Sequence, residues 1–446
     1  MTTEMRPEQK GMRRRSFSAC KSPLPTSLCV LTATVAAAFA SGAWAQDSGG
    51  GAFGGQDPSP YYIGANQSIT RDSNVYRTPE ATADTYYSTG LLGGIDQPFG
   101  RQRFYANGNV QLNRYQNQDT QNNTSYGLRT GLDWSTIERI SGSVNLSLNQ
   151  GLASYGGSGT VPLRKKNVQS NDQFGANVKW GEASLLSLNA GYTHNRLRYS
   201  AEEYTGSELN QDAIAAGVTY RPSALLSLGA GLRHTRGRYP GLSEANGNSF
   251  TRNDLDLTTV WNASGQSTVS ARLSIGRQSY GGGSARDFSG LTGSLAWAYK
   301  PTGKLSFNTV LLRDTGNETS FANLASSTGT KPVTLNGDNS RITNSISVNA
   351  LYLATGKIRA NAGVRYVRRS LAESTAVSST GQQSLSGSDS SRGVTLGANY
   401  APARNWLLAC DLARDSRTAS QDAIFGNLSY TYSVNTATCS AQFTFQ

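Results

Sequence analysis

From Tyr61 to the end of the chain, apolar and polar residues alternate in segments of roughly 10–16 residues, which predicts β-strands with one apolar face. The connections between these segments also alternate, one short and the next long. Short turns at one end and long loops at the other are typical of an antiparallel barrel that crosses the outer membrane. The pattern therefore predicts an all-β, up-and-down transmembrane β-barrel of about 18 strands, with 16 as the alternative count.

The last segment, residues 427–446, shows the alternation over the greatest length. Its apolar residues fall first on even and then on odd positions: Leu428, Tyr430, Tyr432, Val434, then Ala437, Cys439, Ala441, Phe443 and Phe445. The change of phase at Asn435–Thr436 predicts a β-bulge. An amphipathic strand with an aromatic residue next to last is typical of the closing strand of such a barrel.

Aromatic residues precede the short connections. Tyr and Trp at one level on the lipid-facing side form a girdle where the bilayer meets water. The predicted periplasmic girdle consists of Trp134, Trp180, Tyr220, Trp261, Tyr299, Tyr352, Tyr400 and Phe445. A β-sandwich also has aromatic strand ends, but it would not keep every second connection long.

The long connections are rich in Gly, Ser, Thr and Asn and are expected on the extracellular side. They are Asp72–Asp84, Gly151–Ser170, Ala201–Glu208, Pro240–Ser249, Thr315–Ser340, Ser370–Ser391 and Ser416–Phe425, with shorter ones near Gln116–Asn122 and Gly281–Ala285. Thr315–Ser340 and Ser370–Ser391 are long enough to fold inward as a constriction.

The first 45 residues predict a secretory signal peptide. The basic run Arg13–Arg15 precedes an apolar stretch from Leu28 to about Ala40, and Ala43–Ala45 offers a small-x-small cleavage site. The apolar stretch is too short to span a membrane as a helix. The expected domains are 1–45 signal peptide, 46–60 flexible linker and 61–446 outer-membrane β-barrel.

Composition agrees with an exported barrel. Apolar residues make up only 37% of the chain, and the mean hydropathy is −0.44, which is poor for a soluble core but sufficient when only every second residue meets lipid. Intrinsic disorder also fits low hydropathy, but the alternating Tyr, Val and Leu argue against it. Outside the leader the basic residues are dispersed rather than clustered on one face, so nucleic acid is not an expected partner.

Removal of the leader leaves Cys410 and Cys439. An exported protein with two cysteines is expected to form a disulfide. Both residues fall on the same face of neighbouring strands, so a cross-strand bond is predicted toward the periplasmic side, where it would clamp the last hairpin.

The polar faces of the strands are expected to line a water-filled interior. They carry small polar runs such as Ser141, Ser143, Asn145, Ser147 and Asn149. The charged residues predicted there are Arg129, Lys179, Arg233, Arg272, Arg359 and Arg365, against Asp133, Asp254, Asp256 and Asp411. The expected pore is lined by Asn and Ser and is mildly cationic.

Arginines also fall just beyond the outer apolar band on the lipid-facing side. Arg196, Arg198, Arg236, Arg238 and Arg368 are expected at the depth of lipopolysaccharide phosphates, where charge-assisted bonds are favourable. Ordinary solvated strand tips are the alternative. The repeat of residues 184–199 at 224–239 places the two histidines of the chain, His194 and His234, at equivalent positions.

No metal or catalytic site is expected. No Cys or carboxylate cluster converges on either histidine by spacing, and no Ser/His/Asp set or phosphate-binding Gly loop is present. The chain is therefore not expected to be an enzyme or to hold a cofactor.

The leader, the barrel length, turns such as Tyr220-Arg221-Pro222 and the ending Cys439–Gln446 resemble the outer-membrane β-barrel porins of the EpsL-like group, which is associated with exopolysaccharide-biosynthesis (exosortase-linked) operons of Gram-negative bacteria. The resemblance implies an outer-membrane pore that supports exopolysaccharide export. A general or sugar-selective diffusion porin is one alternative, and a structural or adhesive barrel with a plugged lumen is another. Expected partners are outer-membrane lipid and lipopolysaccharide, the barrel-assembly machinery, polysaccharide and periplasmic export proteins.

Overall fold

The computed structural model describes residues 59–137, 139–155, 164–181, 184–242, 248–281, 287–315, 340–377, 381–422 and 429–445. Within the strands, the side chains of residues 340–341, 372–377 and 381–386 are not among those described. The predicted signal peptide and most of the linker lie outside the described residues. No helix in the described part of the chain is long and apolar enough to cross a bilayer.

The described residues form strands joined by turns and loops. Two short 3-10 helices, η1 (Asp119–Gln121) and η2 (Glu202–Ser207), lie in long connections. The strands are β1 (Tyr61–Asp72), β2 (Asp84–Phe99), β3 (Gln102–Tyr115), β4 (Asn123–Ser135), β5 (Ile140–Leu152), β6 (Val168–Trp180), β7 (Leu186–Tyr199), β8 (Leu209–Ser223), β9 (Leu226–Arg238), β10 (Ser249–Ser264), β11 (Ser267–Tyr280), β12 (Phe288–Tyr299), β13 (Leu305–Asp314), β14 (Ser340–Leu353), β15 (Ile358–Val377), β16 (Gly381–Tyr400), β17 (Trp406–Ala419) and β18 (Tyr432–Phe445).

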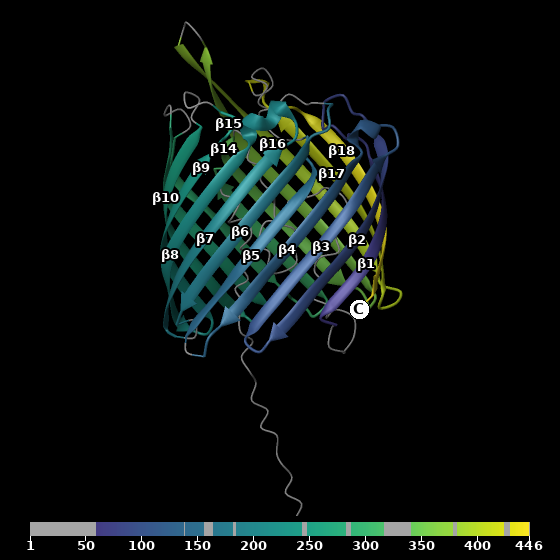
Figure 1. The fold of residues 1–446 in the computed structure, drawn as a ribbon. Helices are drawn as coiled ribbons and strands as arrows, with labels where there is room; N and C mark the ends of the chain where they lie inside the picture. Colours follow the sequence, from purple (N-terminus) through teal and green to yellow (C-terminus); the bar gives the residue numbers. More distant parts are fainter. Residues whose placement is uncertain are drawn as a thin grey trace, which may run out of the picture. The chain divides into compact units, whose positions relative to one another are not determined.

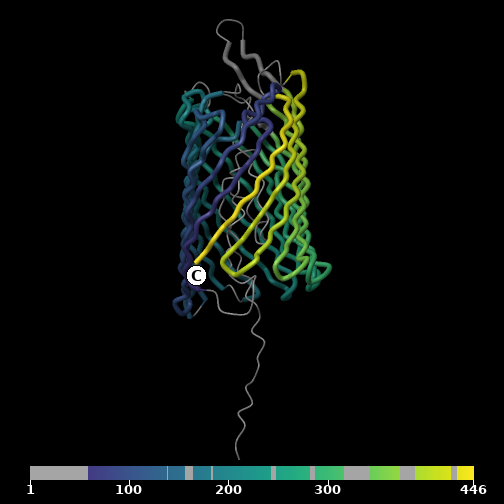
Figure 2. The backbone as a smooth tube through the Cα atoms, turned by 90° about the vertical axis from the view of Figure 1, so that its right-hand side faces the viewer, coloured from purple at the N-terminus to yellow at the C-terminus, as the bar shows by residue number. Residues whose placement is uncertain are grey.

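The strands form one closed antiparallel sheet of 18 strands, as predicted. Each strand pairs with its neighbours in the chain, and β1 pairs with β18 from Ile63↔Phe445 to Asp72↔Thr436. Figures 1 and 2 show the strands tilted around the barrel wall, with the last strand beside the first. Closure leaves no sheet edge, so the backbone N–H and C=O groups of the wall are bonded to one another.

The two faces of the sheet are inverted relative to a soluble protein. Large apolar side chains such as Leu91 and Leu232 are exposed (66% and 68%), whereas polar ones such as Thr70 and Ser274 are fully buried. An apolar exterior of this size is stable only against lipid. The barrel is therefore an outer-membrane protein.

The predicted girdle residues lie at the strand ends that meet the short turns. Trp180, Trp261 and Phe445 are 51%, 51% and 60% exposed on the outward face. Tyr220, Tyr352 and Tyr400 are exposed there too, while Trp134 and Tyr299 are half-buried at the same end of β4 and β12. Since short turns of such barrels face the periplasm, this end is taken as periplasmic and the opposite end as extracellular.

The predicted bulge at Asn435–Thr436 is wrong. β18 pairs with β17 and β1 without a register shift, and it begins at Tyr432 rather than at 427. A bulge would interrupt ladders on both sides of the strand at once. Val434 instead points inward and is 2% exposed, because the extracellular end of the barrel interior is packed with side chains and can hold an apolar residue.

The prediction of a long loop at Ser370–Ser391 is also wrong. β15 and β16 are each 20 residues long and remain paired to Val377↔Gly381. Beyond Leu371 and Asp389 they pair only with each other, since β14 and β17 have ended. Serine and threonine are compatible with both loop and strand, so composition could not decide between them. Most of Thr315–Ser340 lies outside the described residues.

The last hairpin carries a disulfide beside the closing seam of the barrel. Cys410 and Cys439 lie directly opposite each other in the β17–β18 ladder, with Cα atoms 4.1 Å apart, and their sulfur atoms are bonded. Both side chains are on the outward face, in line with Leu408 and Leu412. On its other side Cys439 pairs with Ile69 of β1, so the bond ties together the strands that meet at the seam.

Removing this disulfide should destabilise the barrel. The sequence separation of 29 residues corresponds to a loop-closure contribution of roughly 3–4 kcal/mol in the chain-entropy description. We expect Cys410→Ala/Cys439→Ala to lower the free energy of unfolding by up to about this amount. Urea unfolding in lipid vesicles, followed by tryptophan fluorescence, would measure it.

Reductant provides the control for this experiment. It should lower the unfolding midpoint of the native chain and leave that of the double variant unchanged. Equal midpoints for the oxidised and reduced native chain would contradict a stabilising role.

Candidate functional site: the inner wall of the barrel

All of the charged residues predicted to face the lumen lie on the inward side of the sheet. Along its strand, each occupies the set of alternate positions that also holds the buried polar residues. The exposed apolar residues occupy the other set. They are Arg129 and Asp133 on β4, Lys179 on β6, Arg233 on β9, Asp254 and Asp256 on β10, Arg272 on β11, Arg359 and Arg365 on β15, and Asp411 on β17. Contact with solute remains a prediction.

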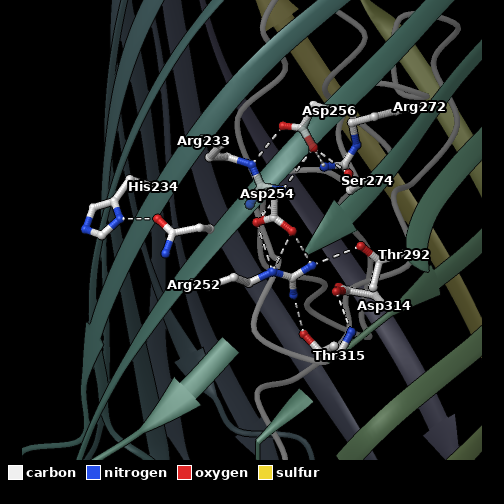
Figure 3. Close-up of polar contacts among 11 residues, drawn as sticks. Arg233, His234, Arg252, Asp254, Asp256, Arg272, Ser274, Thr292, Asp314 and Thr315 are labelled. Carbon is white, nitrogen blue, oxygen red and sulfur yellow. Dashed lines mark hydrogen bonds and ion pairs between the residues drawn. The ribbon is translucent and has the colours of Figure 1, made fainter. Parts of the chain in front are cut away.

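The structure brings four of these residues together on β9, β10 and β11. The guanidinium of Arg233 lies 3.0 Å from Asp254 Oδ2 and donates through Nε to Asp256 Oδ2, also at 3.0 Å. Arg272 Nη1 lies 3.7 Å from Asp256 Oδ1. The strand register explains the contact between Arg233 and Asp254, because the two residues are directly opposite each other in the β9–β10 ladder. Figure 3 shows the side chains converging on the inside of the wall.

Arg252 completes this group and was missed from the sequence. Its side chain is 1% exposed and bonds to Asp254, Thr315 Oγ1 (2.7 Å) and Thr292 Oγ1 (2.9 Å). The sequence contains the pattern that could have identified it, because Arg252, Asp254 and Asp256 are alternate residues of one strand and must share a face. The ion-pair network of Arg233, Arg252, Asp254, Asp256 and Arg272 will be called the β9–β11 network.

Burial makes the β9–β11 network interdependent. The side chain of Asp254 is fully buried and that of Arg233 is 4% exposed, so each charge has lost most of its hydration. Such charges are tolerated only when paired and hydrogen-bonded, and removing one partner leaves another uncompensated. Ser274 donates a further hydrogen bond to Asp256. The network therefore holds three strands of the wall in fixed register.

A second buried group, also missed from the sequence, lies toward the extracellular end of β15–β17. Arg369 forms a two-bond contact with Asp389, at 2.9 Å through Nε and 2.5 Å through Nη2. Ser429 donates to the same carboxylate, and Arg417 lies 3.9 Å from it. Arg417 also covers the ring of Tyr432 at 5.1 Å. These residues come from distant parts of the chain, so periodicity within one strand could not pair them.

Two further inward ion pairs are more exposed. Arg365 pairs with Asp415 at 2.8 Å, with side chains 43% and 36% exposed. Arg103 pairs with Asp96 near the periplasmic end, where Arg103 and Arg129 also flank the Tyr105 ring.

Among the described residues in the regularly paired parts of the strands, inward basic and inward acidic residues are equal in number, and a mildly cationic wall stays a prediction. In the regularly paired parts of the strands, the inward basic residues are Arg103, Arg129, Lys179, Arg233, Arg252, Arg272, Arg359, Arg365, Arg369 and Arg417. The inward acidic residues there are Asp72, Asp84, Asp96, Asp133, Asp254, Asp256, Asp314, Asp389, Asp411 and Asp415. The sequence prediction named fewer of these acidic residues than of the basic ones.

Aromatic side chains pack the interior at the extracellular end. Phe250 is 2% exposed and packs with Leu197 and Leu209, and the rings of Tyr86 and Tyr115 stack at 4.7 Å. Tyr155, in the connection after β5, donates a hydrogen bond to the Lys165 carbonyl at 2.9 Å. Burial raises the pKa of Tyr155, which extends the pH range over which its hydroxyl can donate further into the alkaline. This packing fixes the shape of the mouth.

The described residues contain no group of three or more His, Cys, Asp or Glu side chains that could hold a metal ion. His194 and His234 lie on the outward face, away from the inner wall.

No protein-family model matches the chain, and no curated protein matches it. Among solved structures, it is similar to the outer membrane protein OpdK of Pseudomonas aeruginosa, with 15% identity, coverage of 86% of this chain and 99% of that one, and a TM-score of 0.44. OccK5 (OpdH) of the same organism has 12% identity, coverage of 86% and 98%, and a TM-score of 0.43. Likenesses this remote carry no argument about the solute, and the resemblance to the EpsL-like group stays a prediction.

Burial of the β9–β11 network predicts that its disruption is costly. We expect Asp254→Asn to lower the free energy of unfolding by about 3 kcal/mol, because the neutral amide leaves Arg233 and Arg252 without their shared counter-charge. The matched control is Asp415→Asn, which breaks an exposed pair and should cost no more than about 1 kcal/mol. Urea unfolding midpoints in lipid vesicles would measure both effects. Equal losses of unfolding free energy in the two variants would contradict burial as the cause of the larger loss.

Proposed function

We infer that this chain is a passive outer-membrane pore for hydrophilic solutes, and that its preferred solutes are neutral and rich in hydroxyl groups, as saccharides are. One observation carries the proposal: an 18-stranded closed barrel turns a polar wall inward. Barrels of 16–18 strands are wide enough to enclose an aqueous channel. Partly exposed polar side chains on the inward face, such as Asn109, Ser141 and Asn149, can offer hydrogen bonds that sugar hydroxyls exchange for those of water.

The pairing of the inward charges supports neutral solutes over ions. Opposite charges in contact, such as Arg233 with Asp254 and Arg369 with Asp389, largely cancel at a distance. Such a wall gives little net attraction to either sign of ion. It can still donate and accept hydrogen bonds, which is the interaction that a neutral sugar uses.

Exopolysaccharide export is the finer hypothesis, and it rests on the resemblance to the EpsL-like group rather than on the geometry. Under it, a polymer would pass along the polar wall, and periplasmic export proteins would deliver the polymer to the periplasmic mouth. The barrel-assembly machinery would insert the chain into the membrane. Uptake of small sugars by diffusion is the alternative use of the same wall.

Conductance and solute flux test the pore directly. We expect the purified protein to conduct ions in planar bilayers with a cation-to-anion permeability ratio near one, and to admit neutral sugars in vesicle-swelling assays faster than charged solutes of equal size. Absence of both current and swelling would reject the pore and favour the barrel with a plugged lumen.

Lys179 and Arg359 provide a test of the inward register. Both lie near the periplasmic end of the inner wall, outside the two buried ion-pair groups. Lys179→Ser/Arg359→Ser should shift selectivity toward cations by roughly twofold in 0.1 M salt, where charges act over about 10 Å. The control, Arg277→Ser, removes an outward charge and should change nothing. A shift in the control but not in the double variant would refute the register.

The direction of transport needs a cellular measurement. If the chain serves export, deleting its gene should reduce surface polysaccharide and leave growth on limiting sugars intact. The opposite pair of results would indicate uptake and would contradict the export hypothesis.

A further inference from the structure

A ring of arginines surrounds the outward face at the extracellular border of the apolar band. On many strands an arginine follows the last large exposed apolar residue by two positions, as Arg71 follows Ile69 and Arg277 follows Ile275. The outward arginines of this ring are Arg71, Arg114, Arg196, Arg198, Arg236, Arg238, Arg277, Arg313, Arg368, Arg392 and Arg414. Two residues along a strand span about 6.7 Å, so the guanidinium groups stand immediately above the apolar surface.

The opposite border of the band is different. In the periplasmic half of the described strands, the outward positions carry aromatic and aliphatic residues such as Trp180, Trp261 and Leu408, and no charged ones. The outward charge is therefore confined to one side of the membrane. An asymmetric belt of this kind matches a bilayer whose two leaflets differ in headgroup charge.

The ring is densest on β7 and β9, the strands of the repeat, which carry two of its arginines each. Arg196 and Arg238 flank Asn210 in one row across the sheet, and His194, Asp212 and Arg236 form the next row. These residues, together with the outward residues Asp172, Arg198, His234, Asn253 and Arg277, will be called the β6–β11 patch. Its outward acidic residues are only Asp172 and Asp212, so the arginines outnumber them.

Hydrogen bonds within the β6–β11 patch orient its side chains. His234 accepts from Arg236 Nε at 3.1 Å through Nε2 and bonds through Nδ1 to Asn253 Oδ1 at 2.7 Å. Accepting at Nε2 requires the neutral ring with its proton on Nδ1. Figure 3 shows His234 outside the wall, while its neighbour Arg233 points inward. His194 contacts Asp212 at 2.9 Å in the matching position of the other hairpin.

The chemistry of the patch selects its occupant. Guanidinium groups bind phosphate through paired, directional hydrogen bonds, and lysine does not reproduce this geometry. The described strands carry no lysine at an outward position. The phosphates of outer-leaflet glycolipids lie immediately above the hydrocarbon, at the level of these arginines. A soluble anion is not confined to that level.

We propose that the β6–β11 patch is a binding site for the phosphate groups of lipopolysaccharide in the outer leaflet. Arg196, Arg236 and Arg238 supply the guanidinium donors, and His234 positions Arg236. The ring elsewhere on the barrel makes weaker contacts with the same headgroups. This site is independent of the inferred pore, since every residue in it faces away from the lumen.

Lipid retention during purification tests the site. Detergent-solubilised protein would be titrated with bisphosphorylated lipid A and, separately, with lipid A from which the phosphates have been removed, and bound lipid would be counted by native mass spectrometry. We expect the native barrel to bind the phosphorylated form at least tenfold more tightly, as charge-assisted contacts require. Arg196→Gln/Arg236→Gln/Arg238→Gln should remove most of that difference.

The matched control is Arg71→Gln/Arg392→Gln/Arg414→Gln, which removes the same charge from strands that carry one outward arginine each and should reduce affinity much less. Unchanged single-channel conductance would verify that both variants are folded barrels. Equal affinity of the native barrel for both lipid forms would overturn the proposal. Equal losses in the two triple variants would overturn the assignment of the site to β6–β11.

Discussion

Backbone hydrogen bonding in hydrocarbon is the constraint on which this structure depends. A strand in lipid has no water to satisfy its N–H and C=O groups, so every strand needs a partner on both sides. The pairing of β1 with β18 supplies the last of these partners and removes the final edge. Closure in turn fixes the alternation of every strand, because a one-residue slip would exchange the lipid-facing and inward side chains.

Charged side chains are compensated differently on the inner and outer surfaces of the barrel. Inward charges are shielded by one another, as Arg252 and Asp254 illustrate, and this pairing makes them part of the architecture of the wall. Outward arginines such as Arg277 instead stand at the border of the membrane, where headgroups can serve as counter-ions. The same residue type thus stabilises register on one face and meets the lipid on the other.

The period-two pattern was sufficient to predict the barrel, its approximate strand number and the inward face of the charged residues that it singled out. It could not predict which charges touch. Arg369, Asp389 and Arg417 meet through cross-strand register, which a single strand does not encode. It also misjudged Val434, because an apolar residue above the membrane can be buried inside the barrel as readily as it can face lipid. At Ser370–Ser391, composition was read as loop where local pairing between two strands extends the ladder.

The position of the disulfide has a consequence for the order of assembly. Cys410 and Cys439 belong to adjacent strands of one hairpin, so their bond requires only β17 and β18 to meet and not the arrival of β1. Oxidation can therefore precede closure, in the compartment that the chain crosses before it reaches the membrane. A β17–β18 hairpin whose register is already fixed would then offer the free edge of β18 to β1 as a preformed template. The redox state of the periplasm would thereby affect how efficiently β1 pairs with β18.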